Sequence, residues 1–255
     1  MSATDLVTAE LTLTGRITTA SNATFLGTIG EVMVVYKPMA GESPLWDFPD
    51  GALAHREVAA YLVSEHLGWD VVPHTWLRDG PLGEGMVQLW KEQDPDQDAV
   101  NLVATDEVPE TGWKHVLEGQ DQSGRMVALI HEDTSALRRM AVFDLIVNNA
   151  DRKGDHVLAM PGGNRHGVDH GLTFHREHKL RTVLWGWLGD SLSTEELDGI
   201  DRVSEGLDGD LGEALADLLS AEEIAALAAR CAKLRLARRF PAPAGDMPAV
   251  PWPLF

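Results

Sequence analysis

The sequence predicts an α+β fold of two lobes, with a β-rich N-terminal lobe and a mainly helical C-terminal lobe. Residues 1–92 consist mostly of short alternating or β-branched segments around one helical stretch. From residue 111 to residue 255, helical spacing dominates and one small hairpin interrupts it. Residues 93–110 are acidic and are expected to form a linker or an exposed loop between the lobes. Separate blocks of strands and helices are typical of the α+β class.

In the N-terminal part we expect several strands and one helix. The residue pattern predicts strands over residues 11–14, 31–36, 71–77 and 85–90. Residues 18–27 are small and polar, and we expect them to form a hairpin-like loop. A helix is expected to open at Asp50-Gly51 and to continue to about Leu67, with Gly68 as the residue that ends it.

In the C-terminal part we expect two longer helices and a hairpin. The first helix begins at residues 133–135, which are good N-caps, and ends around Asn148. Strand-like pieces follow at residues 156–160 and 167–168. The last helix runs from about Ala221 to Arg239 after Ser220 as its N-cap. The tail from Pro241 holds 5 of the 13 prolines and should be extended.

The composition limits the classes of protein to which the chain can belong. Its 255 residues, 44% of them hydrophobic, suffice for one large domain or two small ones. A single cysteine, Cys231, excludes a disulfide framework within the chain and cysteine-based metal sites. We expect no membrane-spanning helix and no secretory signal, because no apolar run approaches about 18 residues and the N-terminal residues are polar. These observations predict a cytoplasmic protein.

The net charge of −19 is concentrated in two segments. Residues 92–110 contain seven acidic side chains and no Lys or Arg, and residues 190–223 contain twelve acidic side chains and one base. The remainder of the chain is close to neutral, so the two segments predict solvated acidic surface. Because no basic stripe is present, we expect no nucleic-acid partner, and membrane contact at most at the periphery.

Two segments carry residues suited to chemistry. Residues 142–158 contain Asp151-Arg152-Lys153 after a helical run, and residues 167–174 read Gly-Val-Asp-His-Gly-Leu-Thr-Phe. Phosphoryl transfer from a nucleotide needs one carboxylate near the attacking hydroxyl and another that holds divalent metal on the phosphates. It also needs a cation that neutralises developing charge. The two segments offer side chains for all of these tasks.

The same segments resemble the catalytic and metal-binding loops of the phosphoinositide 3-/4-kinase superfamily, and most closely those of type II phosphatidylinositol 4-kinases. Residues 34–38 resemble the strand with the phosphate-binding lysine, residues 55–62 the helix whose glutamate pairs with it, and residues 85–89 the linker that holds adenine. The match covers roughly residues 18–175 and extends to small actinobacterial proteins described only as phosphoinositide-kinase-like. It implies a bilobal protein-kinase-like fold with ATP between the lobes.

The resemblance also implies roles for residues of the N-terminal lobe. The residues expected to bind the nucleotide are Ser21, Thr24, Lys37, Glu57, Gln88 and Leu89. Lys37 would contact phosphates, and Glu57, 20 residues further on, would position it through an ion pair. Taken alone, a lysine before a proline also fits an exposed strand end, and a lone helical glutamate also fits solvent. The loop around Ser21 lacks the multiple glycines of the protein-kinase Gly-rich loop.

In the C-terminal lobe the resemblance places the catalytic and metal-binding groups. Asp151 would orient or deprotonate the acceptor hydroxyl, and Arg152 would brace the loop. Lys153 lies two residues after Asp151, where Ser/Thr protein kinases place a lysine that contacts the γ-phosphate. Asp169 is the expected metal ligand, because a carboxylate suits Mg²⁺.

Position 156 departs from the family pattern. Five residues after the catalytic aspartate the superfamily has an asparagine that binds a second metal ion, whereas this chain has His156. Imidazole is a poorer ligand for Mg²⁺ and suits softer ions such as Mn²⁺. Three interpretations stay open: His156 binds metal with a preference for Mn²⁺, Asp155 replaces it after a small shift, or one metal site is lost and activity is weak or absent.

The phosphate acceptor is left open by the sequence. Residues 175–181 would form the activation segment and are locally basic, which suits a phosphorylated or inositol-phosphate acceptor but also a charged surface loop. We expect a kinase acting on an inositol lipid, an inositol compound or a protein Ser/Thr. The competing hypothesis is an inactive pseudokinase that binds nucleotide or inositol phosphate as a regulator. A hydrolase lacks support, since no Gly-x-Ser-x-Gly motif is present.

Overall fold

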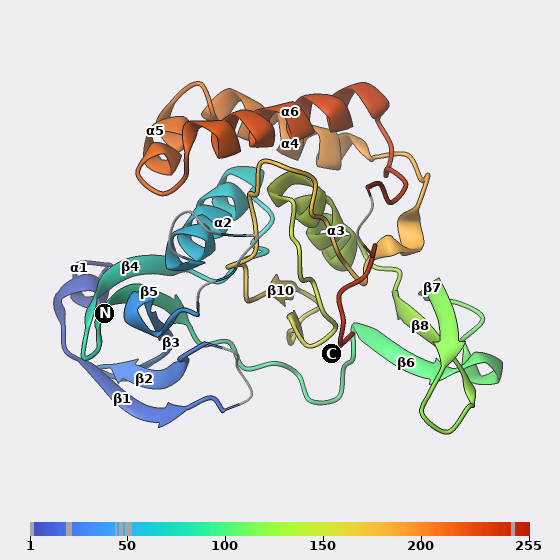
Figure 1. The fold of residues 1–255 in the computed structure, drawn as a ribbon, viewed down its shortest axis with the longest axis horizontal. Helices are drawn as coiled ribbons and strands as arrows, with labels where there is room; N and C mark the ends of the chain where they lie inside the picture. The colour runs from blue at the N-terminus through green and yellow to red at the C-terminus, as the bar shows by residue number, and fades with distance from the viewer. Residues whose placement is uncertain (1–2, 19–21, 44, 46–47, 49–52, 246–247) are drawn as a thin grey trace.

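The structure, a computed structural model, describes residues 3–18, 22–43, 45, 48, 53–245 and 248–255. Figure 1 shows a β-sheet lobe beside a helical lobe, with a second small sheet at the far side of the molecule. The predicted α+β class, with a β-rich N-terminal lobe and a mainly helical C-terminal lobe, is therefore confirmed. None of the described helices is long and apolar enough to cross a membrane.

The N-terminal lobe is one antiparallel sheet with a helix packed on it. The sheet has the order β1-β2-β3-β5-β4. Its strands are β1 (Leu11–Arg16), β2 (Phe25–Ile29), β3 (Val32–Pro38), β4 (Thr75–Gly80) and β5 (Gly83–Leu89). Helix α2 (Leu53–Leu67) lies against β4 and β5, and Gly68, with a φ of 68°, follows its last residue. The expected helix start at Asp50-Gly51 lies outside the described residues.

The alternation of side chains along β3 decides which residue faces the helix. Val34 and Tyr36 are fully buried on one face of the sheet, where they pack with Ile29 of β2. The intervening positions point to the other face, so Lys37 shares the side on which α2 packs. Its pairing partner Met86 is buried there against α2. The position of Lys37 in β3 therefore places its side chain between the sheet and α2.

The sequence interpretation was wrong at several places in this half of the chain. Helix α1 (Ala3–Thr8) precedes β1, and β2 begins inside the expected loop at 18–27. The acidic stretch at 93–110, expected to be linker or loop, contains β6 (Val100–Ala104). This strand joins β7 (Trp113–Gln120) and β8 (Met126–Glu132) in a sheet of order β6-β8-β7. The acidic side chains of this stretch lie before and after β6, and none lies within it. The stretch was therefore interpreted as a loop although it contains a mainly apolar strand.

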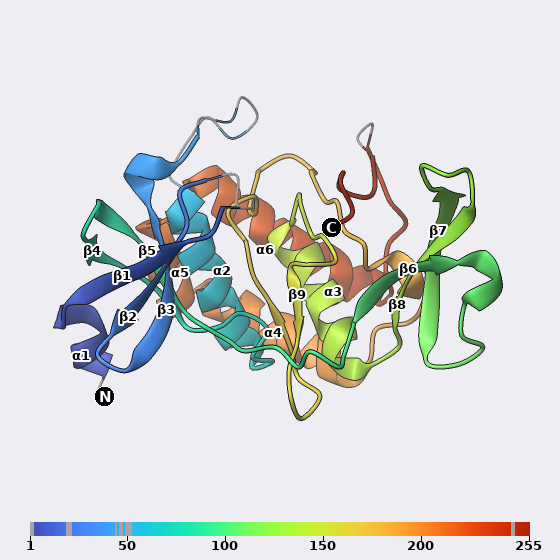
Figure 2. The same ribbon diagram turned by 90° about the horizontal axis from the view of Figure 1, so that it is seen from below.

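The C-terminal lobe is built around helix α3 (Ser135–Val147), whose N-cap Thr134 accepts a hydrogen bond from the Leu137 N–H. Between α3 and the next helix lies the predicted hairpin of β9 (Val157–Ala159) and β10 (Arg165–Gly167). Helices α4 (Thr194–Gly206), α5 (Asp210–Ala216) and α6 (Ala221–Ala237) cover α3 and α2 (Figure 2). The expected N-cap of the last helix, Ser220, forms a capping box with Glu223.

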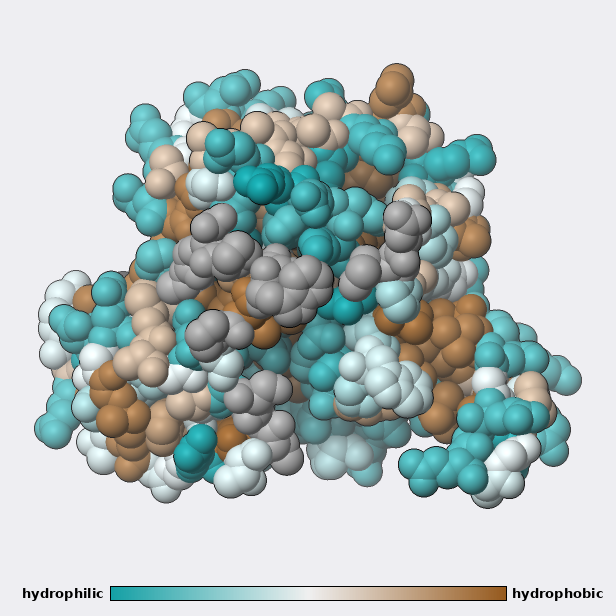
Figure 3. Space-filling model, viewed as in Figure 1, coloured by the Kyte–Doolittle hydropathy of each residue, from teal (hydrophilic) through white to brown (hydrophobic). Residues whose placement is uncertain are grey.

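The second acidic segment is also structured. Helix α4 begins with a capping box of Ser193 and Glu196, and buries Leu197, Ile200 and Val203 in the main core. Of its acids, Glu195 and Asp198 are exposed, in keeping with the hydrophilic surface over the helical lobe in Figure 3, whereas Glu196 is buried. Figure 3 also shows an apolar patch where the three-stranded sheet meets the rest of the molecule. Charge alone therefore did not distinguish an amphipathic helix from a solvated loop.

A buried histidine ties the three-stranded sheet to the helical lobe. The His131 Nδ1–H donates to the Glu132 carbonyl at 2.9 Å, and Nε2 accepts from the Gly186 N–H at 3.0 Å. Nε2 must be unprotonated to accept that bond. Burial lowers the pKa of His131 from 6.5 to about 4. Folding therefore keeps this ring neutral at pH values at which the unfolded chain would be protonated.

We predict that His131 makes the protein sensitive to acid. A depressed pKa means that the stability contribution is fully present above pH 6.5 and is lost as the pH falls toward 4. Between pH 7 and pH 4.5 the wild-type protein should lose about 2 kcal/mol more unfolding free energy than His131→Gln. Urea unfolding at the two pH values measures this difference, with His115→Gln at an exposed position as the control. Equal losses in wild type and His131→Gln would contradict the assignment.

Candidate functional site

The lysine of β3 lies between two carboxylates from different parts of the fold. The Lys37 Nζ donates to Glu57 Oε1 of α2 at 2.6 Å and to Asp169 Oδ1 at 2.8 Å. The Glu57 side chain is 2% exposed and that of Asp169 is 52% exposed, so the lysine bridges the interior and the opening of the site. The predicted Lys37–Glu57 pair is present in the structure, and Asp169 joins it.

Lys37 and Asp169 each shift the pKa of the other. Burial alone would lower the pKa of Lys37, but Asp169 and Glu57 outweigh it and raise that pKa above its ordinary value. Lys37 in turn holds the pKa of Asp169 well below its usual range against the opposing effect of burial. Both groups are therefore charged throughout the physiological pH range.

Glu57 also connects α2 to the segment that carries Asp169. Its Oε2 accepts the backbone N–H of His170 at 2.8 Å, while Oε1 holds Lys37. Asp169 has a φ of 60°, a left-handed conformation that non-glycine residues seldom adopt. The short polar side chain of an aspartate tolerates this conformation better than most. The resulting turn brings the carboxylate of Asp169 to Lys37.

The loop after α3 is held by a buried arginine. Helix α3 ends at Asn148, which has a φ of 56° and turns the chain. Arg152 is fully buried; its Nε lies 3.0 Å from Asp144 Oδ2 of α3, and its Nη2 lies 2.9 Å from Asp144 Oδ1. Its Nη1 donates to the carbonyls of His156 and Val168. Arg152 therefore braces the loop, in the role that the resemblance implied.

The same arginine determines the protonation of His170. The Arg152 Nη2 donates to His170 Nε2 at 2.7 Å, so Nε2 carries the lone pair and Nδ1 carries the hydrogen. Burial, with the nearby Arg152 charge, holds the pKa of His170 well below its usual value. The neutral ring links the Arg152 loop to the Asp169 turn.

Asp151 lies in the loop with its carboxylate at the cavity. Its N–H donates to Asn149 Oδ1 at 3.0 Å, and Lys153 Nζ lies 3.6 Å from its Oδ2. Burial raises the pKa of Asp151, and the Asp169 charge adds to this, while Lys153, His156 and Arg181 oppose it. A carboxylate with a raised pKa accepts protons more readily than one in water, which suits a general base.

His156 is oriented by the backbone of Asp151. Its Nδ1 lies 2.8 Å from the Asp151 carbonyl, which can only accept, so Nδ1 carries the hydrogen. Its Nε2 lies 3.5 Å from Asp169 Oδ2 and 3.8 Å from Asp155 Oδ1. In the neutral ring, the Nε2 lone pair therefore faces the two carboxylates that the sequence predicts as metal ligands.

Four of these groups, Lys37, Glu57, Asp151 and Asp169, meet at one cavity of about 180 Å³ between the lobes. Its lining is Asn22, Ala23, Lys37, Pro38, Glu42, Ser43, Leu45, Leu53, Ala54, Glu57, Asp151, Asp169, Gly171 and Leu172. Among these described residues, four carboxylates face one lysine. The cavity is therefore acidic as well as enclosed, although it contains the expected phosphate-binding cation.

Other predicted site residues lie elsewhere. Thr24 is buried, and its hydroxyl donates to the Asn22 carbonyl at 3.2 Å. Gln88 is buried in β5 and donates to the Thr75 hydroxyl, while Leu89 packs on the core of the sheet. None of these three residues lines the cavity, so their contact with a nucleotide stays a prediction. Ser21 lies outside the described residues.

Sequence reasoning missed two residues that shape the site. Glu42 lines the cavity and accepts the N–H groups of Leu53 and Ala54, so it caps the N-terminus of α2. Asp144 lies seven residues before Asp151 and anchors Arg152. The signal for Asp144 was an acid within an otherwise apolar helical run. Glu42 acts from a loop, where no spacing rule applies.

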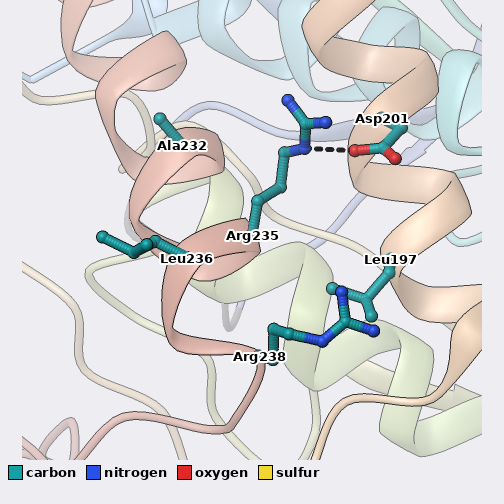
Figure 4. A pocket seen from close by; sticks show the side chains of 6 residues that line it. All are labelled: Leu197, Asp201, Ala232, Arg235, Leu236 and Arg238. Atoms are coloured by element: carbon teal, nitrogen blue, oxygen red, sulfur yellow. Dashed lines mark ion pairs between the residues drawn. The ribbon is translucent and has the colours of Figure 1, made fainter.

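A second hollow, of about 360 Å³, lies between α4 and α6 and is the larger of the two. Figure 4 shows its lining and the ion pair between Asp201 and Arg235 that spans it. Its remaining lining is Leu197, Ala232, Leu236 and Arg238. This hollow contains no pair of side chains suited to acid–base chemistry, so the smaller cavity is the candidate active site.

No set of three His, Cys, Asp or Glu side chains is gathered as a ready metal site within the part of the chain that the structure describes. Asp169 and His156 form a pair, and Asp155, 60% exposed, lies at its edge. Mg²⁺ in nucleotide enzymes commonly takes one or two protein ligands and completes its shell with phosphate and water. The pair therefore fits a shared site for metal and nucleotide better than a purely protein-made one.

The chain is similar in sequence to a mycobacterial protein. No protein-family model matches the chain. It is 49% identical to protein Rv2133c of Mycobacterium tuberculosis, across 98% of this chain and 94% of that protein. The chain belongs to the Rv2133c family. Among solved structures, the Helicobacter pylori proinflammatory kinase CtkA aligns over 92% of this chain and 94% of its own, with a TM-score of 0.48 and 11% identity. A structural likeness at that level carries no argument about the activity of the Rv2133c family.

We predict that the Asp144–Arg152 pair is essential to the stability of this member of the Rv2133c family. Asp144→Ala would leave the Arg152 charge buried and unpaired, which should lower the unfolding free energy by about 3–5 kcal/mol. Denaturant unfolding measures the loss. The matched control is Glu195→Ala, which breaks an exposed pair with Arg139 and should cost less than about 1 kcal/mol. Similar losses in both variants would contradict the prediction.

Proposed function

We propose that this protein is an ATP-dependent phosphotransferase of the phosphoinositide-kinase-like kind that transfers the γ-phosphate to a hydroxyl group. The observation that carries the proposal is the meeting of Lys37, Glu57, Asp151 and Asp169 at one cavity between a sheet lobe and a helical lobe. These groups come from four separate parts of the chain. Phosphoryl transfer requires this combination of a positioned cation, a metal-binding carboxylate and a carboxylate near the acceptor.

In this proposal the chain's own residues have distinct tasks. Lys37 contacts the phosphates of the nucleotide, and Glu57 fixes the direction of its ammonium group. Asp151 orients the acceptor hydroxyl and takes its proton, for which its raised pKa suits it. Lys153, 3.6 Å from Asp151, neutralises charge on the transferred phosphoryl group. Each task needs only side chains that already lie at the site or beside it.

The charge of the cavity supports divalent metal as part of the substrate complex. A triphosphate next to Glu42, Glu57, Asp151 and Asp169 would be repelled if Lys37 were its only counter-charge. Asp169 would hold a metal ion together with His156 Nε2 or Asp155, while the Asp151 carbonyl orients the His156 ring through Nδ1–H. A bound Mg²⁺ or Mn²⁺ supplies Lewis-acid stabilisation of phosphate charge.

The acceptor belongs to the same proposal. Residues 175–181 follow the Asp169 turn, and Arg181 donates to the Ala150 carbonyl beside Asp151. This basic segment borders the catalytic loop of an otherwise acidic chain, which favours an anionic acceptor. We propose an inositol lipid, an inositol compound or a protein Ser/Thr as acceptor, in the cytoplasm and with membrane contact at most peripheral.

A regulator without turnover is the second candidate function. It is favoured by His156, which stands where the resembled kinases have a metal-binding asparagine. Imidazole competes poorly with oxygen for Mg²⁺. In that case the cavity would bind nucleotide or inositol phosphate, and ligand at 100 times its Kd would stabilise the fold by about 2.7 kcal/mol without product formation.

We predict that Asp151→Asn removes phosphotransfer. The variant keeps the size of the side chain but cannot accept the proton, so transfer should fall by about 10²–10⁴-fold. The assay incubates γ-phosphate-labelled ATP with the protein and inositol lipids in Mg²⁺ or Mn²⁺, and follows label into protein, organic extract and free phosphate. Since the pKa of Asp151 is raised, the wild-type rate should also decline as the pH falls through that pKa.

The matched control for this assay is Asp198→Asn, which alters an exposed aspartate of α4. It should leave the rate unchanged. Thermal melts with ATP and metal report binding separately in every variant. Nucleotide stabilisation without any Asp151-dependent label in either metal would reject the kinase proposal and favour the regulator.

We predict that His156→Asn changes the metal preference. The wild-type protein should be more active with Mn²⁺ than with Mg²⁺, because the imidazole Nε2 is a softer ligand than an amide oxygen. In His156→Asn the ratio of the Mn²⁺ rate to the Mg²⁺ rate should fall by about tenfold. Titration of each metal in the phosphotransfer assay measures the ratio, with His115→Asn at an exposed site as control. An unchanged ratio would exclude His156 as a metal ligand.

A further inference from the structure

The loop that carries Asp151 is in contact with a distant part of the chain, the tail segment 248–255. The Gly154 N–H donates to the Leu254 carbonyl at 2.8 Å. A Cβ atom added to Gly154 would overlap the Phe255 ring, so the ring lies directly on that glycine. Figures 1 and 2 both show the red end of the chain beside the loop that follows α3.

The tail segment is itself anchored next to the loop. The Ala249 carbonyl accepts the Thr182 N–H at 3.1 Å and the Trp185 Nε1–H at 2.8 Å. Pro251 is buried, and Leu254 packs against the main hydrophobic core. The strand-like segment at 181–183 that binds the tail also pairs with Arg152. Residues 181–183 therefore support both the tail segment and the loop that carries Asp151.

Gly154 lies between the groups that the proposed reaction needs. It follows Asp151 by three residues and precedes His156 by two. Arg152 fixes the inner side of the loop, whereas the side chain of Asp155 on its outer side is 60% exposed. On this outer side the Leu254 carbonyl and the Phe255 ring oppose movement of the loop backbone. A displacement of about 1 Å at a catalytic group can reduce a rate by about 10²-fold.

We propose that Leu254 and Phe255 are positioning residues that hold the loop of Asp151 and His156 in its working conformation. Phe255 acts through van der Waals contact with Gly154, and Leu254 through its backbone carbonyl. Neither residue is among the described residues that line the cavity. The inference rests on the proposed phosphotransferase function for its kinetic consequence, while its structural consequence is measured without turnover.

The test compares Phe255→Ala, Gly154→Ala and the double variant with wild type in the chain of 255 residues. Phe255→Ala should lower kcat by about tenfold and leave the KM for ATP within about twofold. Gly154→Ala, whose added methyl would strike the ring, should also lower kcat. In the Phe255→Ala background the same glycine substitution should cost nothing further, because the obstacle is gone. Trp252→Ala is the matched control, since Trp252 is 85% exposed on the same segment.

Amide hydrogen exchange of the nucleotide-free protein provides the second readout. Phe255→Ala should speed exchange at Gly154 and Val157, and leave the amides of α3 protected as evidence of intact folding. If wild type shows no phosphotransfer but Phe255→Ala speeds exchange in the loop, the proposed function fails and the positioning role stands. Unchanged loop exchange, additive losses in the double variant, or a rise in kcat on removal of the ring would each overturn the positioning role.

Discussion

The architecture of the site depends on one buried ion pair, Asp144 with Arg152. Both side chains are completely inaccessible to solvent, so two charges lose their hydration. Such a pair is tolerated only where hydrogen bonds replace water. All five N–H groups of the guanidinium have acceptors: Asp144, His170 and the carbonyls of His156 and Val168. Asp144 also accepts from Asn149 and Thr182.

This network explains how the two halves of the site are held against each other. Arg152 fixes the loop of Asp151 directly, and it fixes the Asp169 turn through the ring of His170. Glu57 accepts a hydrogen bond from the His170 N–H of the same turn and pairs with Lys37 of the sheet lobe. The chain of contacts runs from α3 to β3 through side chains of defined protonation state. The ammonium group of Lys37 in the sheet lobe is thereby placed next to the Asp169 carboxylate of the helical lobe.

The sequence predicted those parts of the site that depend on local spacing. The Lys37–Glu57 pair was implied by the resemblance, and its interval of 20 residues fits a strand followed by a helix that packs against the same sheet. The α3 boundary and the capping by Ser220 were also predicted, since caps and helical periodicity are local signals. The strand β6 and the helices α4 and α5 were missed because their apolar residues lie within strongly acidic stretches, where solvated loops have a similar composition.

What the sequence could not predict depends on tertiary contacts. The role of Glu42 as a cap of α2 follows from a loop that folds back over the helix, and no periodicity encodes it. The contact of Phe255 with Gly154 joins residues about a hundred positions apart, where only the folded backbone decides proximity. Thr24 and Gln88 were assigned from resemblance, and their side chains donate hydrogen bonds inside the sheet lobe, so their contact with a nucleotide stays a prediction. A side-chain type at the expected position does not fix the direction in which it points.

The two carboxylate oxygens of Asp169 have different partners, and this difference bears on the proposed reaction. Oδ1 is paired with Lys37, whereas Oδ2 faces His156 Nε2 at 3.5 Å and is open to solvent on one side. In the proposed reaction, a cation bound with the nucleotide would meet Oδ2 beside His156 Nε2, and Lys37 would exchange Oδ1 for a phosphate while it stays paired with Glu57. The His156 ring is in turn hydrogen-bonded to the Asp151 carbonyl, so it lies between Oδ2 of Asp169 and the backbone of the proposed base. Under the proposed function, this imidazole would couple metal binding at Asp169 to acceptor activation at Asp151.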